Sequence, residues 1–171
     1  MIFKKCWVEG KKFGEPKKSD PEDTLREGIC ASEHARITQA FKDGQESKLR
    51  DFYIFLAVCN TVVVEDSADQ IRYQASSPDE EALVKASADV GIVLKQQTAH
   101  TKTLSINERE FEYTVIAEFP FDSTRKRMSL VIEENGEHWV YTKVKYRAIT
   151  LRARIRSWSL ALILSQETRV T

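Results

Sequence analysis

The chain has 171 residues, and its 26 basic side chains balance its 26 acidic ones. This length suits one ordinary domain with a single hydrophobic core. Because the net charge is zero, general electrostatic attraction to nucleic acid or to an anionic membrane is excluded, and any anion site must be local. The three cysteines lack a Cys-x-x-Cys spacing, so we expect reduced thiols in a cytosolic compartment and no metal site.

The first part of the chain predicts little regular structure. Two short strands, Ile2–Val8 and Lys11–Phe13, are separated by a Glu-Gly turn and predict a hairpin. The stretch 14–44 is polar and contains two prolines, so we expect a loop with only a marginal helix between Glu33 and Phe41.

A stronger helix is predicted from Ser47 onwards. Apolar residues recur at three- and four-residue steps from Leu49 to Val63, which makes one apolar face suited to packing on a sheet. Cys59 lies on this stripe and is expected to be buried as a small hydrophobic side chain.

A second helix is predicted after Ser77. Ser77 suits the N-cap, Pro78 suits the first helical position, and Glu80 completes a Ser-x-x-Glu capping box. Gly91 is placed to end the helix.

The remainder of the chain reads as strands. Asn135-Gly136 separates two alternating segments and fits a type I′ hairpin turn. Helices followed by antiparallel strands predict an α+β fold in which helices pack on an antiparallel β-sheet. The predicted strands are Ile92–Leu94, Thr103–Ile106, Phe111–Phe119, Met128–Glu133 and Glu137–Lys143.

Three strings along the chain resemble a known family. They read LAVCNTVVVE from Leu56, YQASSPDEEALV from Tyr73 and EFPFDSTRKRMSLVI from Glu118. Together they closely resemble the nucleotide-binding domain of phospholipid flippases, the type IV branch of the P-type ATPases. The resemblance covers residues 1–143 and implies the nucleotide-binding fold of that family.

The resemblance also implies a set of ATP-binding residues. Phe121 matches the phenylalanine that stacks on adenine, and core packing is the competing explanation, which the residues alone would favour. Glu80 matches the acidic residue that faces the adenine amino group, and the capping box is the competing explanation.

The remaining implied residues are a serine, two lysines and a methionine. Met128 matches a methionine of the base pocket, and Ser123 stands where related pumps carry a polar or basic contact. Lys126 and Lys143 match lysines directed at the nucleotide. Lys126 is equally explained as a solvated charge, and Lys143 is followed by Val144 where the family has glycine.

In the full-length pump, this resemblance implies that the domain binds ATP with Mg²⁺ and drives aminophospholipid movement from the outer to the cytoplasmic leaflet. The expected location is the cytosolic face of a membrane, and the expected partner is the remainder of the pump. The DKTGT motif, whose aspartate is phosphorylated, and the later hydrolysis motifs do not occur in this sequence. We therefore expect a soluble chain that binds ATP without turnover, with no catalytic residue and no transmembrane segment of its own.

Residues 144–171 have a different character, with six basic residues against one acidic residue. We expect this segment to be a divergent tail outside the family fold. The alternative is a basic amphipathic segment that binds a membrane or partner, which would make the chain a non-nucleotide interaction module. Nucleic-acid binding is not expected, because the basic residues do not accompany a recognisable recognition fold.

Overall fold

The computed structural model describes residues 1–16, 28–67 and 70–144, together with the backbone of 151–155. Within these ranges the helices are α1 Ala31–Lys42, α2 Ser47–Val58 and α3 Pro78–Asp89. The strands are β1 Cys6–Val8, β2 Lys11–Phe13, β3 Val63–Ser67, β4 Gln70–Gln74, β5 Ile92–Gln97, β6 Thr101–Ile106, β7 Arg109–Asp122, β8 Arg127–Glu134, β9 Glu137–Val144 and β10 Leu151–Ile155.

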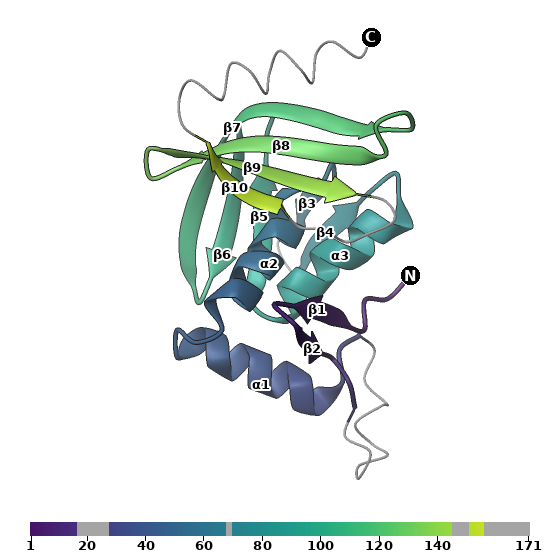
Figure 1. The fold of residues 1–171 in the computed structure, drawn as a ribbon, viewed down its shortest axis with the longest axis vertical. Helices are drawn as coiled ribbons and strands as arrows, with labels where there is room; N and C mark the ends of the chain where they lie inside the picture. Colours follow the sequence, from purple (N-terminus) through teal and green to yellow (C-terminus); the bar gives the residue numbers. More distant parts are fainter. Residues whose placement is uncertain (17–27, 68–69, 145–150, 156–171) are drawn as a thin grey trace.

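A six-stranded sheet forms the larger layer of the molecule (Figure 1). Its strand order is β10-β9-β8-β7-β6-β5, and each neighbouring pair is antiparallel. Strands β1 and β2 form a separate hairpin, as do β3 and β4. The predicted α+β class with an antiparallel sheet is therefore confirmed.

Helix α2 joins the helical layer to the sheet. Every residue from Tyr53 to Val58 is buried, so this half of the helix is enclosed on all sides. The ring of Phe55 packs edge-on against Tyr141 of β9, with ring centroids 5.6 Å apart. Aromatic pairs in this geometry add to the stabilisation from area burial, so this contact fixes the end of α2 against β9.

The predicted helix from Ser47 is too long at its C-terminal end. Helix α2 ends at Val58, because the Asn60 side-chain amide donates to the carbonyl of Ala57 at 2.7 Å and thereby caps the helix end. Val63 instead begins β3, whose hairpin with β4 the sequence analysis did not predict. Burial of Cys59, which is 1% exposed, is confirmed.

The helical content of the polar stretch 14–44 was also underestimated. Its marginal helix is the full twelve-residue helix α1, which buries Ile37 and Phe41. Tertiary burial of these few apolar residues stabilises a helix whose own sequence signal is weak. Residues 17–27 of the predicted loop lie outside the described residues.

Helix α3 begins as predicted, with Ser77 at the N-cap and Pro78 in the first turn. The capping box itself is wrong, since no side-chain hydrogen bond caps this helix and the Glu80 carboxylate binds elsewhere. The predicted end is confirmed, because Gly91 follows the C-cap with φ +90°. Asn135 and Gly136 both have positive φ, as a type I′ turn requires.

Part of the predicted tail pairs with the sheet. Strand β10 lies antiparallel to β9, with Leu151 opposite Thr142 and Ile155 opposite His138. Residues 145–150 and 156–171 lie outside the described residues, and the boundary at 143/144 stays a prediction. No helix in the described part of the chain has both the length and the apolar composition needed to span a membrane.

Candidate functional site

A bulge near the end of β7 determines where Phe121 lies. The pairing of β7 with β8 shifts between Phe119 and Asp122. Two residues of β7, Pro120 and Phe121, therefore stand opposite one residue of β8, Met128. A bulge bends its strand and redirects a side chain, which is why bulges are frequent beside functional sites. The Phe121 side chain is 46% exposed, so its ring is open to solvent.

Met128 connects this bulge to the next strand. In the register of β8 with β9, Met128 stands opposite Lys143. Phe121, Met128 and Lys143 thus form a row across three neighbouring strands, which lie about 4.8 Å apart in a sheet. Met128 is fully buried and belongs to the hydrophobic core, so it offers no exposed surface to a ligand.

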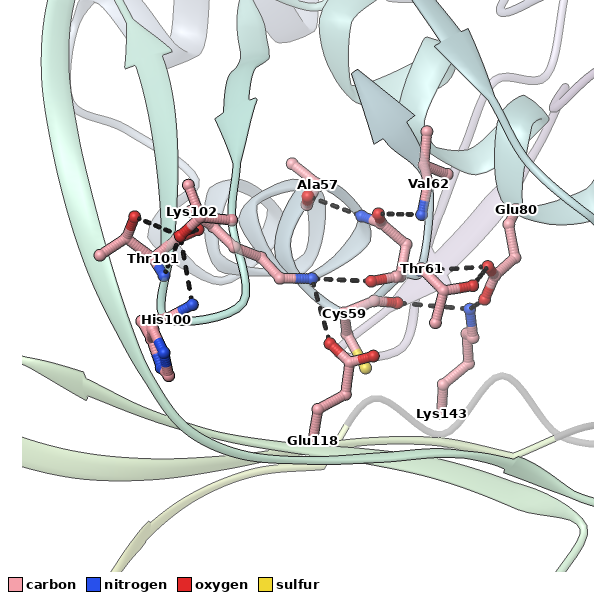
Figure 2. A network of polar contacts seen from close by, with 12 residues as sticks. Ala57, Cys59, Thr61, Val62, Glu80, His100, Thr101, Lys102, Glu118 and Lys143 are labelled. Carbon is pink, nitrogen blue, oxygen red and sulfur yellow. Dashed lines mark hydrogen bonds and ion pairs between the residues drawn. The ribbon is translucent and has the colours of Figure 1, made fainter.

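Lys143 reaches from the sheet to helix α3 (Figure 2). Its Nζ lies 2.5 Å from Oε1 of Glu80, and it also donates to the carbonyl oxygen of Cys59 at 3.3 Å. The two side chains of the ion pair are 21% and 13% exposed, respectively. The pair is thus partly buried, where an ion pair is screened less than at an open surface.

The Glu80 carboxylate has a second partner on its other oxygen. The hydroxyl and the backbone N–H of Thr61 donate to Oε2, at 2.7 and 3.2 Å. Burial by itself would raise the pKa of the Glu80 carboxyl. The hydrogen bonds and charge of Lys143 and the hydrogen bonds of Thr61 outweigh that effect and lower the pKa below its usual value. Glu80 is therefore held as a carboxylate.

A second lysine binds the same helix end. Lys102 of β6 is fully buried, and its Nζ donates to the carbonyl oxygen of Asn60 at 2.7 Å. Its Nζ also lies 3.7 Å from Oε2 of Glu118 on β7. Burial lowers the pKa of Lys102, and Glu118 opposes this shift. Figure 2 shows Lys102, Glu118 and Lys143 all converging on the chain that leaves α2.

Thr61, Lys102 and Glu118 were not singled out from the sequence. For Lys102 a signal was present in the alternation of the sequence, because Lys102 stands two residues before Leu104 and four before Ile106. The structure shows that all three are buried on the same face of β6. A lysine at an inward position of an alternating strand predicts a buried charge that needs partners. For Thr61 no local pattern indicated the contact, which joins residues 19 positions apart.

The other two predicted site residues lie in the turn between β7 and β8. The turn is ordered by Asp122, whose Oδ1 accepts from the N–H groups of Thr124 and Arg125 at 2.9 and 2.8 Å. Lys126 closes the turn with φ 55° and donates its N–H to the Asp122 carbonyl at 2.7 Å. Ser123 and Lys126 are both exposed in this turn, directly after Phe121.

The structure therefore brings the predicted residues together at one end of the sheet. Glu80 and Lys143 are in direct contact, and Phe121 and Met128 continue the row from Lys143. Ser123 and Lys126 lie in the adjoining turn. An exposed aromatic ring, lysines and a carboxylate are the groups that a purine nucleotide can bind through stacking, charge and hydrogen bonds. Their roles in binding stay predictions.

Comparison with known proteins assigns the family. The family described as P-type ATPase, cytoplasmic domain N, matches residues 48–150, a range that contains all six predicted site residues. The chain belongs to the P-type ATPase family. The resemblance to the nucleotide-binding domain of its phospholipid-transporting branch is confirmed by the curated relatives.

Three of these relatives come from mammals and yeast. Human phospholipid-transporting ATPase IC is 34% identical over 77% of this chain, and mouse phospholipid-transporting ATPase IK is 34% identical over 90% of it. Phospholipid-transporting ATPase DRS2 of Saccharomyces cerevisiae is 34% identical over 77% of it. The match spans 12%, 12% and 10% of these relatives, respectively, so the chain corresponds to a small part of each.

Proposed function

We propose that this chain binds ATP and serves as the nucleotide-binding domain of a phospholipid-transporting P-type ATPase. The observation that carries the proposal is the row of Phe121, Met128 and Lys143 across three strands, with Glu80 of α3 bound to its last member. These residues are distant in sequence and come from separate elements, yet they meet at one end of the sheet.

Each aromatic or polar group of the site has a part of ATP that it fits. The ring of Phe121 offers a face for adenine, and stacking of a base on an aromatic ring is worth about 1–3 kcal/mol. The Glu80 carboxylate accepts a hydrogen bond from the exocyclic amino group of the base. Lys126 attracts the phosphates, and the Ser123 hydroxyl donates to a phosphate or ribose oxygen. Lys143, which is bound to Glu80, is directed at the base end of the nucleotide. Met128 stays in the core, opposite Phe121 and Lys143 in the strand register.

The activity of the whole pump is part of this proposal. ATP held by this domain would be presented to a phosphorylated aspartate elsewhere in the full-length protein. That reaction would drive aminophospholipids from the outer to the cytoplasmic leaflet, with this domain on the cytosolic side and the rest of the pump as its partner. Among the described residues, no group of three or more His, Cys, Asp or Glu side chains could hold a metal ion. We expect Mg²⁺ to arrive with the ATP phosphates, whose oxygens are ligands that it prefers.

A titration with a fluorescent ATP analogue tests the proposal. Wild type and Phe121→Ala are compared with Phe111→Ala, which removes another exposed ring from the same strand. A loss of about 1–3 kcal/mol corresponds to roughly 5- to 150-fold weaker binding by Phe121→Ala. Phe111→Ala is expected to bind as wild type does.

Two results would contradict nucleotide binding at this site. One is the absence of saturable binding to wild type, and the other is equal affinity of wild type and Phe121→Ala. Either result would favour the alternative function, an interaction module that keeps the fold and binds a membrane or partner through the basic segment.

A further inference from the structure

The loop 59–61, which follows α2, is held by three elements that are distant in sequence (Figure 2). Lys143 of β9 donates to the carbonyl of its first residue at 3.3 Å, and the hydroxyl of its last residue donates to Glu80 of α3 at 2.7 Å. Between these two contacts, Lys102 of β6 donates to the carbonyl of the middle residue, Asn60, at 2.7 Å. The position of this loop therefore bears directly on where the Glu80 carboxylate lies.

Lys102 also contacts the strand that carries the exposed aromatic ring of the site. Its ammonium nitrogen lies 3.7 Å from Oε2 of Glu118 on β7. Glu118 stands between two shifts in the pairing of β7 with β8, one after Val115 and one after Phe119. Because a bulge bends its strand, a contact at Glu118 bears on the direction in which β7 carries Phe121.

We infer that Lys102 is a positioning residue of the ATP site, which holds the Glu80 carboxylate and the Phe121 ring in one relative arrangement without touching the ligand. The inference rests on the proposed function and concerns a residue to which that function gives no role. Lys102 is 0% exposed, so it acts through its partners. The Asn60 carbonyl connects it to the loop that orients Glu80, and Glu118 connects it to the strand of Phe121.

The burial of Lys102 supports this role. Lys102 shares the inward positions of β6 with Leu104 and Ile106, where an apolar side chain would pack without the cost of removing a charge from water. What an ammonium group adds at this position is a charge-assisted hydrogen bond, which is shorter and stronger than a neutral one. Such a bond fixes the distance between β6 and the loop, whereas apolar packing would leave that distance free to vary.

A purely electrostatic effect of Lys102 on ATP makes a different prediction at Glu118. If the lysine only attracted the polyanion, removing the neighbouring carboxylate by Glu118→Gln would strengthen ATP binding. If the lysine positions the site, Glu118→Gln weakens ATP binding, because the ammonium group loses the charged partner that ties it to β7. The two explanations therefore predict changes of opposite sign for the same variant.

The experiment measures the affinity of the chain for ATP with Mg²⁺ by calorimetry at neutral pH and one fixed salt concentration. Each variant has a control that makes the same change of charge on a neighbouring or the same strand. Lys102→Met is compared with Lys95→Met, which removes a partly buried lysine from β5. Glu118→Gln is compared with Glu112→Gln, which removes an exposed carboxylate from β7. Relative to its control, each variant should bind ATP about two- to tenfold more weakly.

Ser87→Ala controls for a loss of stability that has nothing to do with the site. The Ser87 hydroxyl lies 2.9 Å from the carbonyl oxygens of both Tyr53 and Ile92, near the end of α3 that is opposite to Glu80. Losing these buried contacts should lower stability and leave ATP affinity at the wild-type value, at a temperature at which circular dichroism shows the variant to be folded. A merely structural role of Lys102 would give Lys102→Met the same unchanged affinity.

The outcomes separate the positioning role from the function on which it rests. If wild type binds ATP and Lys102→Met binds it as tightly as Lys95→Met does, the positioning role is wrong and ATP binding stands. The role is also wrong if Glu118→Gln binds ATP as tightly as Glu112→Gln does, or more tightly. Glu118→Gln keeps the lysine and decides the question by itself if Lys102→Met does not fold. If ATP shows no saturable binding to wild type, both the proposed function and the positioning role are overturned.

Discussion

The buried lysine of β6 gives the sharpest prediction about the stability of this domain. Lys102→Met keeps most of the length of the side chain and removes the ammonium group that donates to the Asn60 carbonyl at 2.7 Å. Losing a hydrogen bond from a charged donor and leaving a buried carbonyl without it costs about 1.5–3 kcal/mol. The substitution also abolishes the desolvation cost that lowers the pKa of Lys102, which offsets part of this loss. We expect a net decrease of about 0.5–2 kcal/mol in the free energy of unfolding.

Urea denaturation followed by circular dichroism measures this difference. Lys95→Met, on the neighbouring strand β5 and only partly buried, is the control and should change stability by less than about 0.5 kcal/mol. The pKa of Lys102 is lower in the folded state than its ordinary 10.5, so the unfolded state binds more protons between the two values. Wild type should therefore gain stability relative to Lys102→Met as the pH rises towards 10.5. A Lys102→Met protein as stable as Lys95→Met at neutral pH would refute this account of the network.

Three further predictions concern other parts of the molecule. Folding lowers the pKa of Glu80 from 4.5, so the Glu80 carboxylate stabilises the folded state above pH 4.5, and this stabilisation is lost as the pH falls through the pKa of the folded state. In a series of denaturation measurements at decreasing pH, the difference in stability between wild type and Glu80→Gln should therefore shrink below pH 4.5. A Cβ at Gly14 would lie 2.1 Å from a backbone oxygen at φ +89°, whereas at Gly44 it would meet nothing within 4 Å. Gly14→Ala should therefore lower stability by at least about 2 kcal/mol more than Gly44→Ala, and equal melting temperatures would contradict this. Burial raises the pKa of Cys6 to about 11 and that of Cys59 to about 12, but Cys6 is partly exposed whereas Cys59 is 1% exposed. Mass spectrometry should therefore detect alkylation by iodoacetamide at Cys6 before Cys59.

The sequence predicted most strands because their local signals agree with the fold. Asn135-Gly136 and the alternating segments around it specify a hairpin, and the structure contains it. Helix α1 was underestimated because its stability comes from burying Ile37 and Phe41 against other elements. The end of α2 was misplaced because the Asn60 side chain caps the helix within a run that remains apolar. Periodicity cannot detect such a cap.

Only part of the candidate site could be predicted from the sequence. The family resemblance selected Glu80 and Lys143, and the structure joins them directly. The partners that hold them could not be predicted, because the Cys59 carbonyl and the Thr61 hydroxyl are placed by the loop after α2. The bulge at Phe121 was equally hidden, since it is a property of the register between two strands.

The most direct test of ATP binding at this site is to detect the contacts between the adenine base and the protein. In the NMR spectrum of the chain saturated with ATP, we predict intermolecular nuclear Overhauser effects between the adenine protons and the ring of Phe121, with chemical-shift changes at Glu80 and Lys143. Saturable ATP binding whose contacts and shift changes lie away from this end of the sheet would contradict the central claim.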